Sequence, residues 1–161
     1  MIAVLADTHM PKGGRRLPER AVELLRGAET VLHAGDFFAA SVLNEIDAIC
    51  PGPIHSVHGN VDEGELRAAL PETLEVEFDG ARIAMVHDAG PAKGRLGRMR
   101  ARFPDADAVV FGHSHMPLHE GDGGFQIFNP GSPTERRRAP RRSMGLLKAE
   151  RGKLIFEHIW L

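Results

Sequence analysis

Seven side chains suited to holding metal ions recur along this sequence, most of them directly after a run of apolar residues. They are Asp7, His9, Asp36, Asn60, His87, His113 and His115. Imidazole nitrogens mixed with carboxylate and amide oxygens suit Mn, Fe, Zn, Ni or Co better than Ca or Mg. Each short pattern taken alone is more often a turn, a helix cap or a surface histidine. Their occurrence at successive predicted strand ends favours a metal site.

The spacing of two histidines indicates that this site holds more than one ion. His113 and His115 lie two residues apart after a predicted strand. In an extended chain such residues point the same way with Cα atoms ~6.6 Å apart, whereas paired metals in hydrolytic sites lie ~3.5–4 Å apart. The two rings can therefore serve one ion each, and Gly112 keeps their approach free of bulk. Asp36, a carboxylate at a strand end, is suited to bridge both ions.

The elements that must position these side chains alternate between strand and helix in the first half of the chain. We expect strands over residues 2–6, 30–36 and 53–60, and helices over residues 17–28 and 41–49. Ser41 is the expected N-cap of the second helix. Short apolar strands separated by helices predict a parallel sheet, whose carboxyl ends converge on one crevice. Residues far apart in the sequence can thus share one site.

The second half of the chain predicts a more antiparallel arrangement. Expected elements are a hairpin over 74–87, a helix over 92–103, strands over 107–115 and 125–132, and a closing hairpin over 144–160. Asp79-Gly80 is a strong turn signal for the first hairpin. Two packed sheets with helices outside would accommodate both halves in an α/β fold.

Composition limits the class of protein. With 161 residues, we expect one domain covering 1–161. A formal net charge of -2 argues against a chain that wraps nucleic acid. The single cysteine, Cys50, excludes an intrachain disulfide and a cysteine-based zinc site, and favours a cytoplasmic location. We expect neither a signal peptide nor a membrane partner, because no apolar run approaches ~20 residues.

The motifs together resemble those of the calcineurin-like metallophosphoesterases, in particular the small single-domain bacterial and archaeal phosphodiesterases. The series reads Asp7-Thr8-His9, Gly35-Asp36, Gly59-Asn60-Val61-Asp62, His87 and Gly112-His113-Ser114-His115. The resemblance runs from Leu5 to about Ser132 and includes Asn-Pro-Gly-Ser at 129–132. It implies a four-layer α/β/β/α sandwich with two mixed β-sheets and a metal site at the carboxyl ends of strands.

The same resemblance implies a ligand set and a reaction. One divalent transition-metal ion would be held by Asp7, His9, Asp36 and His115. The second ion would be held by Asp36, Asn60, His87 and His113. A hydroxide bridging the ions would attack a small-molecule phosphate ester in line with the leaving oxygen. His9, Asp36 and Asn60 are the residues expected to act directly in this catalysis.

Two positions depart from the family pattern. Many members carry a histidine where this chain has Val61, and that histidine can protonate the leaving group. We therefore expect weak activity on simple alkyl monoesters and a preference for diesters, with His9 as a weak substitute and Asp62 behind the ligands or capping a helix. Asp88 replaces the usual glycine after His87; it either orients that ring or faces solvent, and we favour solvent.

Other functions remain open. A nuclease or nucleotide phosphatase would use the arginines at 136–142, but we favour a solvated loop there, and equally a solvated helix face for Arg95, Arg98 and Arg102. Nucleic acid is therefore a less favoured partner. A non-catalytic scaffold, the use this fold has in the eukaryotic retromer subunit, is disfavoured because every ligand position is filled. The sequence decides neither the metal nor whether the chain forms a homo-oligomer.

Overall fold

The computed structural model describes residues 1–161 and contains two five-stranded mixed sheets. The first has the strand order β10-β9-β1-β2-β3. Its members are β1 (Ile2–Leu5), β2 (Thr30–His33), β3 (Ile54–Ser56), β9 (Ser143–Glu150) and β10 (Lys153–Trp160). Strands β1, β2 and β3 are parallel to one another. Strand β9 pairs antiparallel with β1, and β10 pairs antiparallel with β9. The sequence prediction of parallel strands first and an antiparallel hairpin last is confirmed.

The second sheet has the order β4-β5-β6-β8-β7. Its strands are β4 (Thr73–Phe78), β5 (Ala81–Val86), β6 (Ala108–Val110), β7 (Leu118–Asp122) and β8 (Phe125–Asn129). The three central strands are parallel, while β4 and β7 pair antiparallel at the two edges. Asp79 and Gly80 both have positive φ, 48° and 80°, as the two-residue turn of the predicted hairpin requires.

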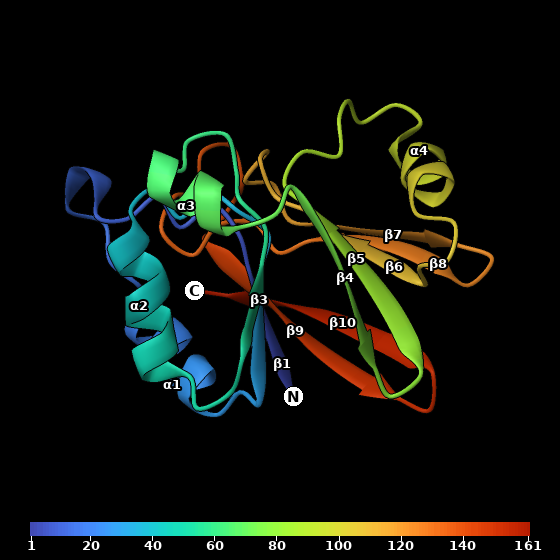
Figure 1. The fold of residues 1–161 in the computed structure, drawn as a ribbon, viewed down its shortest axis with the longest axis horizontal. Coiled ribbons are helices and arrows are strands. Elements are labelled where there is room, and N and C mark those ends of the chain that lie inside the picture. The colour runs from blue at the N-terminus through green and yellow to red at the C-terminus, as the bar shows by residue number, and fades with distance from the viewer.

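Four α-helices and one 3-10 turn complete the fold. The helices are α1 (Glu19–Arg26), α2 (Ala40–Ile49), α3 (Gly64–Ala69) and α4 (Arg95–Arg102), and the 3-10 turn is η1 (Lys12–Gly14). Figure 1 shows α1 and α2 on one side of the molecule and α4 on the opposite side, with the strands of both sheets between them. None of these helices has the length and apolar character needed to cross a membrane.

Alternation along the strands divides the core into separate clusters. In β1, Val4 faces the cluster between the two sheets, whereas Leu5 packs in the cluster beneath α1 and α2. In β5, Met85 faces the same inter-sheet cluster, whereas Ala84 packs in the cluster beneath α4. Side chains of a strand point alternately to its two faces, so each sheet is covered on both sides. The predicted α/β fold with two mixed sheets is confirmed, and these clusters are consistent with the predicted four-layer α/β/β/α sandwich.

Several predicted boundaries are wrong. The strands that lead to the predicted ligands are shorter than predicted, and the one over 107–115 ends at Val110, whereas both predicted hairpins agree with the structure to within about one residue. Helix α2 begins at Ala40 with Ala39 as its N-cap, so Ser41 lies inside the first turn and is no cap. Three elements were not predicted: η1 is a single turn, α3 is too short to show helical periodicity, and β7 is a polar edge strand without an alternating apolar face. The shortened strands leave longer loops, and these loops carry most of the predicted metal ligands.

Candidate metal centre

Most of the predicted ligands lie in left-handed backbone just beyond the strand ends. The φ angles are 56° at Asp7, 44° at His9, 61° at Asp36, 69° at His113 and 57° at His115. A non-glycine residue in this region costs about 1–2 kcal/mol, and such residues cluster at functional sites. Our expectation that His113 and His115 share an extended chain is therefore wrong. Sharp turns, and not strand alternation, aim the two rings in different directions.

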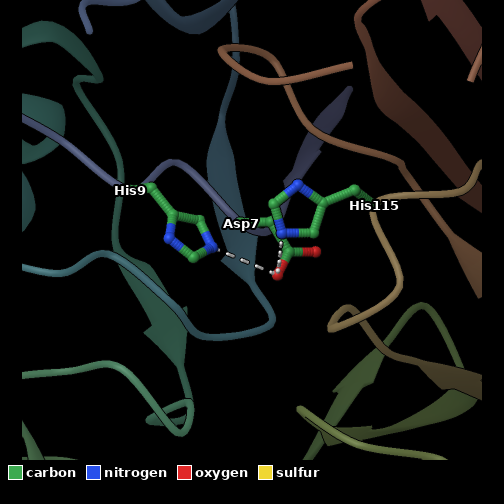
Figure 2. A group of neighbouring side chains, drawn as sticks. All are labelled: Asp7, His9 and His115. Carbon is green, nitrogen blue, oxygen red and sulfur yellow. Dashed lines mark ion pairs between the residues drawn. The ribbon is translucent and has the colours of Figure 1, made fainter. Parts of the chain in front are cut away.

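A first group of ligands consists of Asp7, His9 and His115, all buried. Figure 2 shows the two rings on either side of the Asp7 carboxylate. Asp7 Oδ1 lies 3.5 Å from His115 Nε2 and 3.9 Å from His9 Nε2. The ligand atoms of the group all lie within 4.8 Å of one another. The geometry brings together residues that are far apart in the sequence around one point.

This first group fits a metal ion because its polar atoms are buried without hydrogen bonds. Asp7 Oδ2, His9 Nε2 and both ring nitrogens of His115 have no hydrogen-bond partner. Such a buried unsatisfied group costs about 1–3 kcal/mol, and native proteins keep few of them. A cation among these atoms would give a partner to the Asp7 carboxylate, to His9 Nε2 and to His115 Nε2. The donor set of one carboxylate and two imidazoles also matches the metals expected from the sequence.

A second group surrounds Asn60 and His87. Asn60 Oδ1 lies 3.1 Å from His87 Nε2 and 3.0 Å from His113 Nδ1. His87 Nδ1 donates to the backbone oxygen of Ala34 at 2.8 Å. This bond fixes the tautomer of the neutral ring, so that Nε2 presents its lone pair to the site, as in many histidine metal ligands.

Two carboxylates lie between the groups. Asp36 Oδ2 is 3.3 Å from His9 Nε2 and 3.2 Å from His87 Nε2, so it contacts one histidine of each group. Asp7 also comes within 4.8 Å of the ligand atoms of Asp36 and His87. His115 faces Asp7, whereas His113 faces Asn60. The structure thus brings all seven predicted ligands together, with Asp7 nearer to the second group than the sequence suggested.

The electrostatics of the protein without metal follow from this crowding. Burial disfavours a charged ring, but Asp36 and Asp7 outweigh it and raise the pKa of His9 to about 9. The pKa of His87 is raised in the same way, against burial, chiefly by Asp36. Burial also opposes the charge of Asp36, yet both histidines lower the pKa of this carboxyl far below its usual range. Burial lowers the pKa of His115, which favours the neutral ring.

We expect metal binding at pH 7 to release about one proton or more. His9, with a pKa of about 9, holds a proton at pH 7, and a metal must displace it to use the ring nitrogen. Apparent affinity should therefore rise with pH until about pH 9. Calorimetric titration of Mn in buffers of different ionisation enthalpy measures the released protons. The His9→Asn variant should release about one fewer, and an enthalpy independent of buffer would contradict the assignment.

Asp62 holds together the loops that carry the two groups. Its Oδ2 accepts from the backbone N–H of Gly59 at 2.6 Å and of Asp36 at 3.1 Å. Its Oδ1 accepts from the N–H of Phe38 at 2.8 Å. The N-cap of α3 is Glu63, so Asp62 is not a helix cap. Its buried carboxylate instead fixes the backbone on both sides of the ligands.

The Asp62→Ala variant should lose about 3 kcal/mol of unfolding free energy. It leaves three backbone N–H groups without their acceptor, and hydrogen bonds to charged groups contribute about 1.5–3 kcal/mol each. Urea denaturation followed by circular dichroism measures the loss. Glu63→Ala, next in the chain and exposed, is the matched control and should change stability by less than ~1 kcal/mol. Equal effects of the two variants would contradict the role of Asp62.

The Asn-Pro-Gly-Ser segment at 129–132 supports the ligand loops from behind. Asn129 Nδ2 donates to the oxygen of Gly112 at 2.8 Å, and Ser132 Oγ donates to the oxygen of Asp7 at 2.7 Å. Gly112 leaves room for the site, because a Cβ there would lie 3.0 Å from Asp7 Oδ2. The segment therefore has a structural role beside the ligands.

Sequence reasoning missed Glu135. Its Oε2 lies 3.5 Å from His115 Nδ1 and 3.6 Å from Arg137 Nε, and its Oε1 accepts from Arg15 Nη2 at 3.1 Å. A carboxylate on the far nitrogen of a ligand histidine helps to orient the ring. The one sequence signal for Glu135 is that it closely follows the Asn-Pro-Gly-Ser motif, which ends at Ser132.

The remaining polar residues lie at the edge of the site. Asp88 is exposed; its Oδ1 accepts from Gly90 N–H at 2.7 Å, and its Oδ2 lies 4.0 Å from His113 Nε2. Arg95 and Arg98 donate to backbone oxygens of residues 89–93. Arg98 is exposed, as expected, and Arg95 is partly buried; both arginines also hold the loop before α4.

Comparison with known proteins decides the family. The calcineurin-like phosphoesterase superfamily domain matches residues 1–152. The chain belongs to the calcineurin-like phosphoesterase superfamily. A relative from Methanothermobacter thermautotrophicus, described as a probable metallophosphoesterase, is 30% identical over 136 residues, covering 83% of this chain and 77% of the relative. A Methanocaldococcus jannaschii protein described as a phosphodiesterase is 29% identical over 147 residues, covering 81% and 82%.

Solved structures agree on the fold of this calcineurin-like chain. A single-substitution variant of Vps29 from Entamoeba histolytica superposes with a TM-score of 0.80 at 22% identity, covering 99% of this chain and 98% of that one. At this identity the likeness shows the fold alone. Membership of the superfamily makes the chain a metal-dependent phosphoesterase, as the motifs predicted.

Proposed function

We propose that this chain is a phosphodiesterase that uses two divalent metal ions. One ion would be held by Asp7, His9, Asp36 and His115. The other ion would be held by Asp36, Asn60, His87 and His113. The observation that supports this most strongly is the position of Asp36 Oδ2, which lies 3.3 Å and 3.2 Å from a histidine of each group.

The residues of the chain prepare the site for a phosphate ester. Two divalent ions, when bound, supply positive charge for the phosphoryl oxygens and a water acidic enough to attack near neutral pH. Asp7 and Asp36 compensate only two of the four added charges, so the site keeps a positive balance that attracts an anion. Asn60 and His113 are exposed at the entrance, while the burial of His9 and His115 excludes solvent from the interior.

Val61 supports a preference for diesters. Its backbone N–H donates to Asp36 Oδ1 at 3.0 Å, so the residue lies beside the ligands, but its side chain carries no proton to give. An alkyl monoester needs protonation of a poor leaving oxygen more than an activated diester does. His9 is a weak substitute, because it is itself a proposed ligand.

The test compares three substrates with Mn, Ni and Co. We expect bis(p-nitrophenyl) phosphate to be hydrolysed with higher kcat/KM than p-nitrophenyl phosphate, and glycerol phosphate to be hydrolysed poorly. Val61→His should raise glycerol phosphate hydrolysis about a hundredfold, the usual contribution of a general acid. Val61→Asn, which is polar but donates no such proton, is the matched control. A strong monoester preference in the unaltered protein would reject the diesterase proposal.

The same experiments with Mn, Ni and Co also distinguish an enzyme from a non-catalytic scaffold. The likeness to Vps29 concerns the fold, so it leaves a non-catalytic role as an alternative. A purified chain that binds no Mn, Ni or Co and hydrolyses none of the substrates would favour that alternative. A transition metal such as manganese as the bound ion, and a cytoplasmic location, remain predictions. The structure gives no support for nucleic-acid binding by the arginines at 136–142. Arg136 donates to the backbone oxygen of Pro140, and Arg137 forms an ion pair with Glu135.

A further inference from the structure

A cleft of about 200 Å³ opens from the second ligand group. Three of its lining residues, Asn60, His87 and His113, are proposed ligands. The others that matter to its chemistry are Arg67, Glu72, Asp88 and Arg102, and Val86 is its one hydrophobic lining residue. Most of the side chains that line the cleft are therefore charged or polar. The cleft suits a polar group joined to a phosphate at the metal site.

The two arginines of the cleft differ in what they already bind. Arg102, the last residue of α4, has its Nη2 3.3 Å from Glu72 Oε1. Arg67, in the last turn of α3, is exposed, and no carboxylate of the chain lies within ion-pair distance of it. Asp88 Oδ1 accepts a hydrogen bond from the backbone N–H of Gly90. Arg67 is therefore the arginine of the cleft that has no carboxylate partner within the chain.

We propose that Arg67, supported by Arg102, binds a second anionic group on the ester arm that enters this cleft. The proposal rests on the phosphodiesterase function proposed above and narrows its substrate class. A guanidinium offers a planar pair of donors to a phosphate or carboxylate. Glu72 and Asp88 can meanwhile accept from hydroxyl groups of the same arm. The favoured substrate is a phosphodiester of a polar alcohol that carries a further phosphate or carboxylate.

The position of the helices gives the cleft this selectivity. Helix α3 follows the loop that carries Asn60, and α4 directly precedes in the chain the strand β6, which leads to His113. Arg67 and Arg102 thus come from the two elements next to the second ligand group. The arginines of residues 136–142 lie in the loop after the Asn-Pro-Gly-Ser segment and do not line the cleft.

The test uses two symmetric diesters, so that either arm can enter the cleft. They are bis(p-nitrophenyl) phosphate and its analogue with a carboxylate on each ring. We expect Arg67→Gln to lower the ratio of kcat/KM, carboxylated over uncharged diester, about tenfold, with a smaller fall for Arg102→Gln. Arg67→Lys should keep part of the ratio, because the charge remains. Arg26→Gln, in the last turn of α1 and likewise exposed, is the matched control and should leave the ratio unchanged.

Calorimetric binding of both diesters to the Mn-loaded protein gives a second readout that needs no turnover. A ratio of affinities that is the same in Arg67→Gln and in the unaltered protein would overturn the proposal. A more than tenfold preference of the unaltered protein for the uncharged diester would overturn it as well. If neither diester is hydrolysed but Arg67→Gln still weakens binding of the carboxylated one, the phosphodiesterase proposal fails while the anion site stands.

Discussion

Asp36→Asn should lower kcat/KM for bis(p-nitrophenyl) phosphate at least about a thousandfold, equivalent to ~4 kcal/mol of transition-state stabilisation. The substitution keeps the size of the side chain but removes its charge. Asp36 Oδ2 lies within 3.3 Å of His9 Nε2 and 3.2 Å of His87 Nε2, where one carboxylate serves both ligand groups. A neutral amide is a weaker metal ligand than a carboxylate, and it bridges two cations poorly.

Three measurements separate this loss from unfolding. Thermal denaturation should show a folded variant, because Asn keeps an oxygen for the Val61 N–H, now 3.0 Å from Asp36 Oδ1. Metal analysis should show fewer ions per chain than in the unaltered protein. Asp105→Asn, an exposed carboxylate after α4, is the control and should keep full activity. Full activity of Asp36→Asn would mean that the bridging role belongs elsewhere, with Asp7 as the first alternative.

The ligands were predictable because they stand where the chain leaves apolar strands. Leu5 pairs with His33 in the parallel register of β1 and β2, so the residues that follow both strands must lie side by side. Asp7 and Asp36 follow these strands, and the Asp7 N–H donates to the oxygen of Gly35 at 3.0 Å. The hydrophobic pattern sets the register, and the register brings the two carboxylates together.

The surroundings of the ligands were harder to predict, because they depend on loops meeting in space. Nothing local in the sequence shows that Asp62 accepts from the N–H of Phe38, or that Glu135 approaches His115. The direction of the His113 and His115 rings was predicted from an extended chain, but the backbone is left-handed at both residues. The division of the two rings between two ligand groups nevertheless agrees with the geometry, for a different reason from the one that predicted it.

Gly59→Ala should lower kcat/KM by about a hundredfold or more while leaving every ligand in the sequence. A Cβ at residue 59 would lie 2.0 Å from Asp36 Oδ1 and 2.4 Å from Asp36 N. These contacts are far below any real van der Waals separation, so the loop or the carboxylate must move. A shift of about 1 Å in a catalytic group is enough to cost this much activity. Steady-state kinetics with bis(p-nitrophenyl) phosphate measures the loss.

Gly64→Ala is the matched control, five residues further along the same segment. A Cβ there has nothing within 4 Å, and the residue begins α3. Alanine is a better helix former than glycine by about 0.8–1 kcal/mol, so this variant should be slightly more stable and fully active. Gly59→Ala should instead melt at a lower temperature and bind Mn more weakly, because the displaced Asp36 belongs to both ligand groups. Equal activity of the two alanine variants would contradict this prediction. It would mean that the close contact between Gly59 and Asp36 does not maintain the geometry of the site.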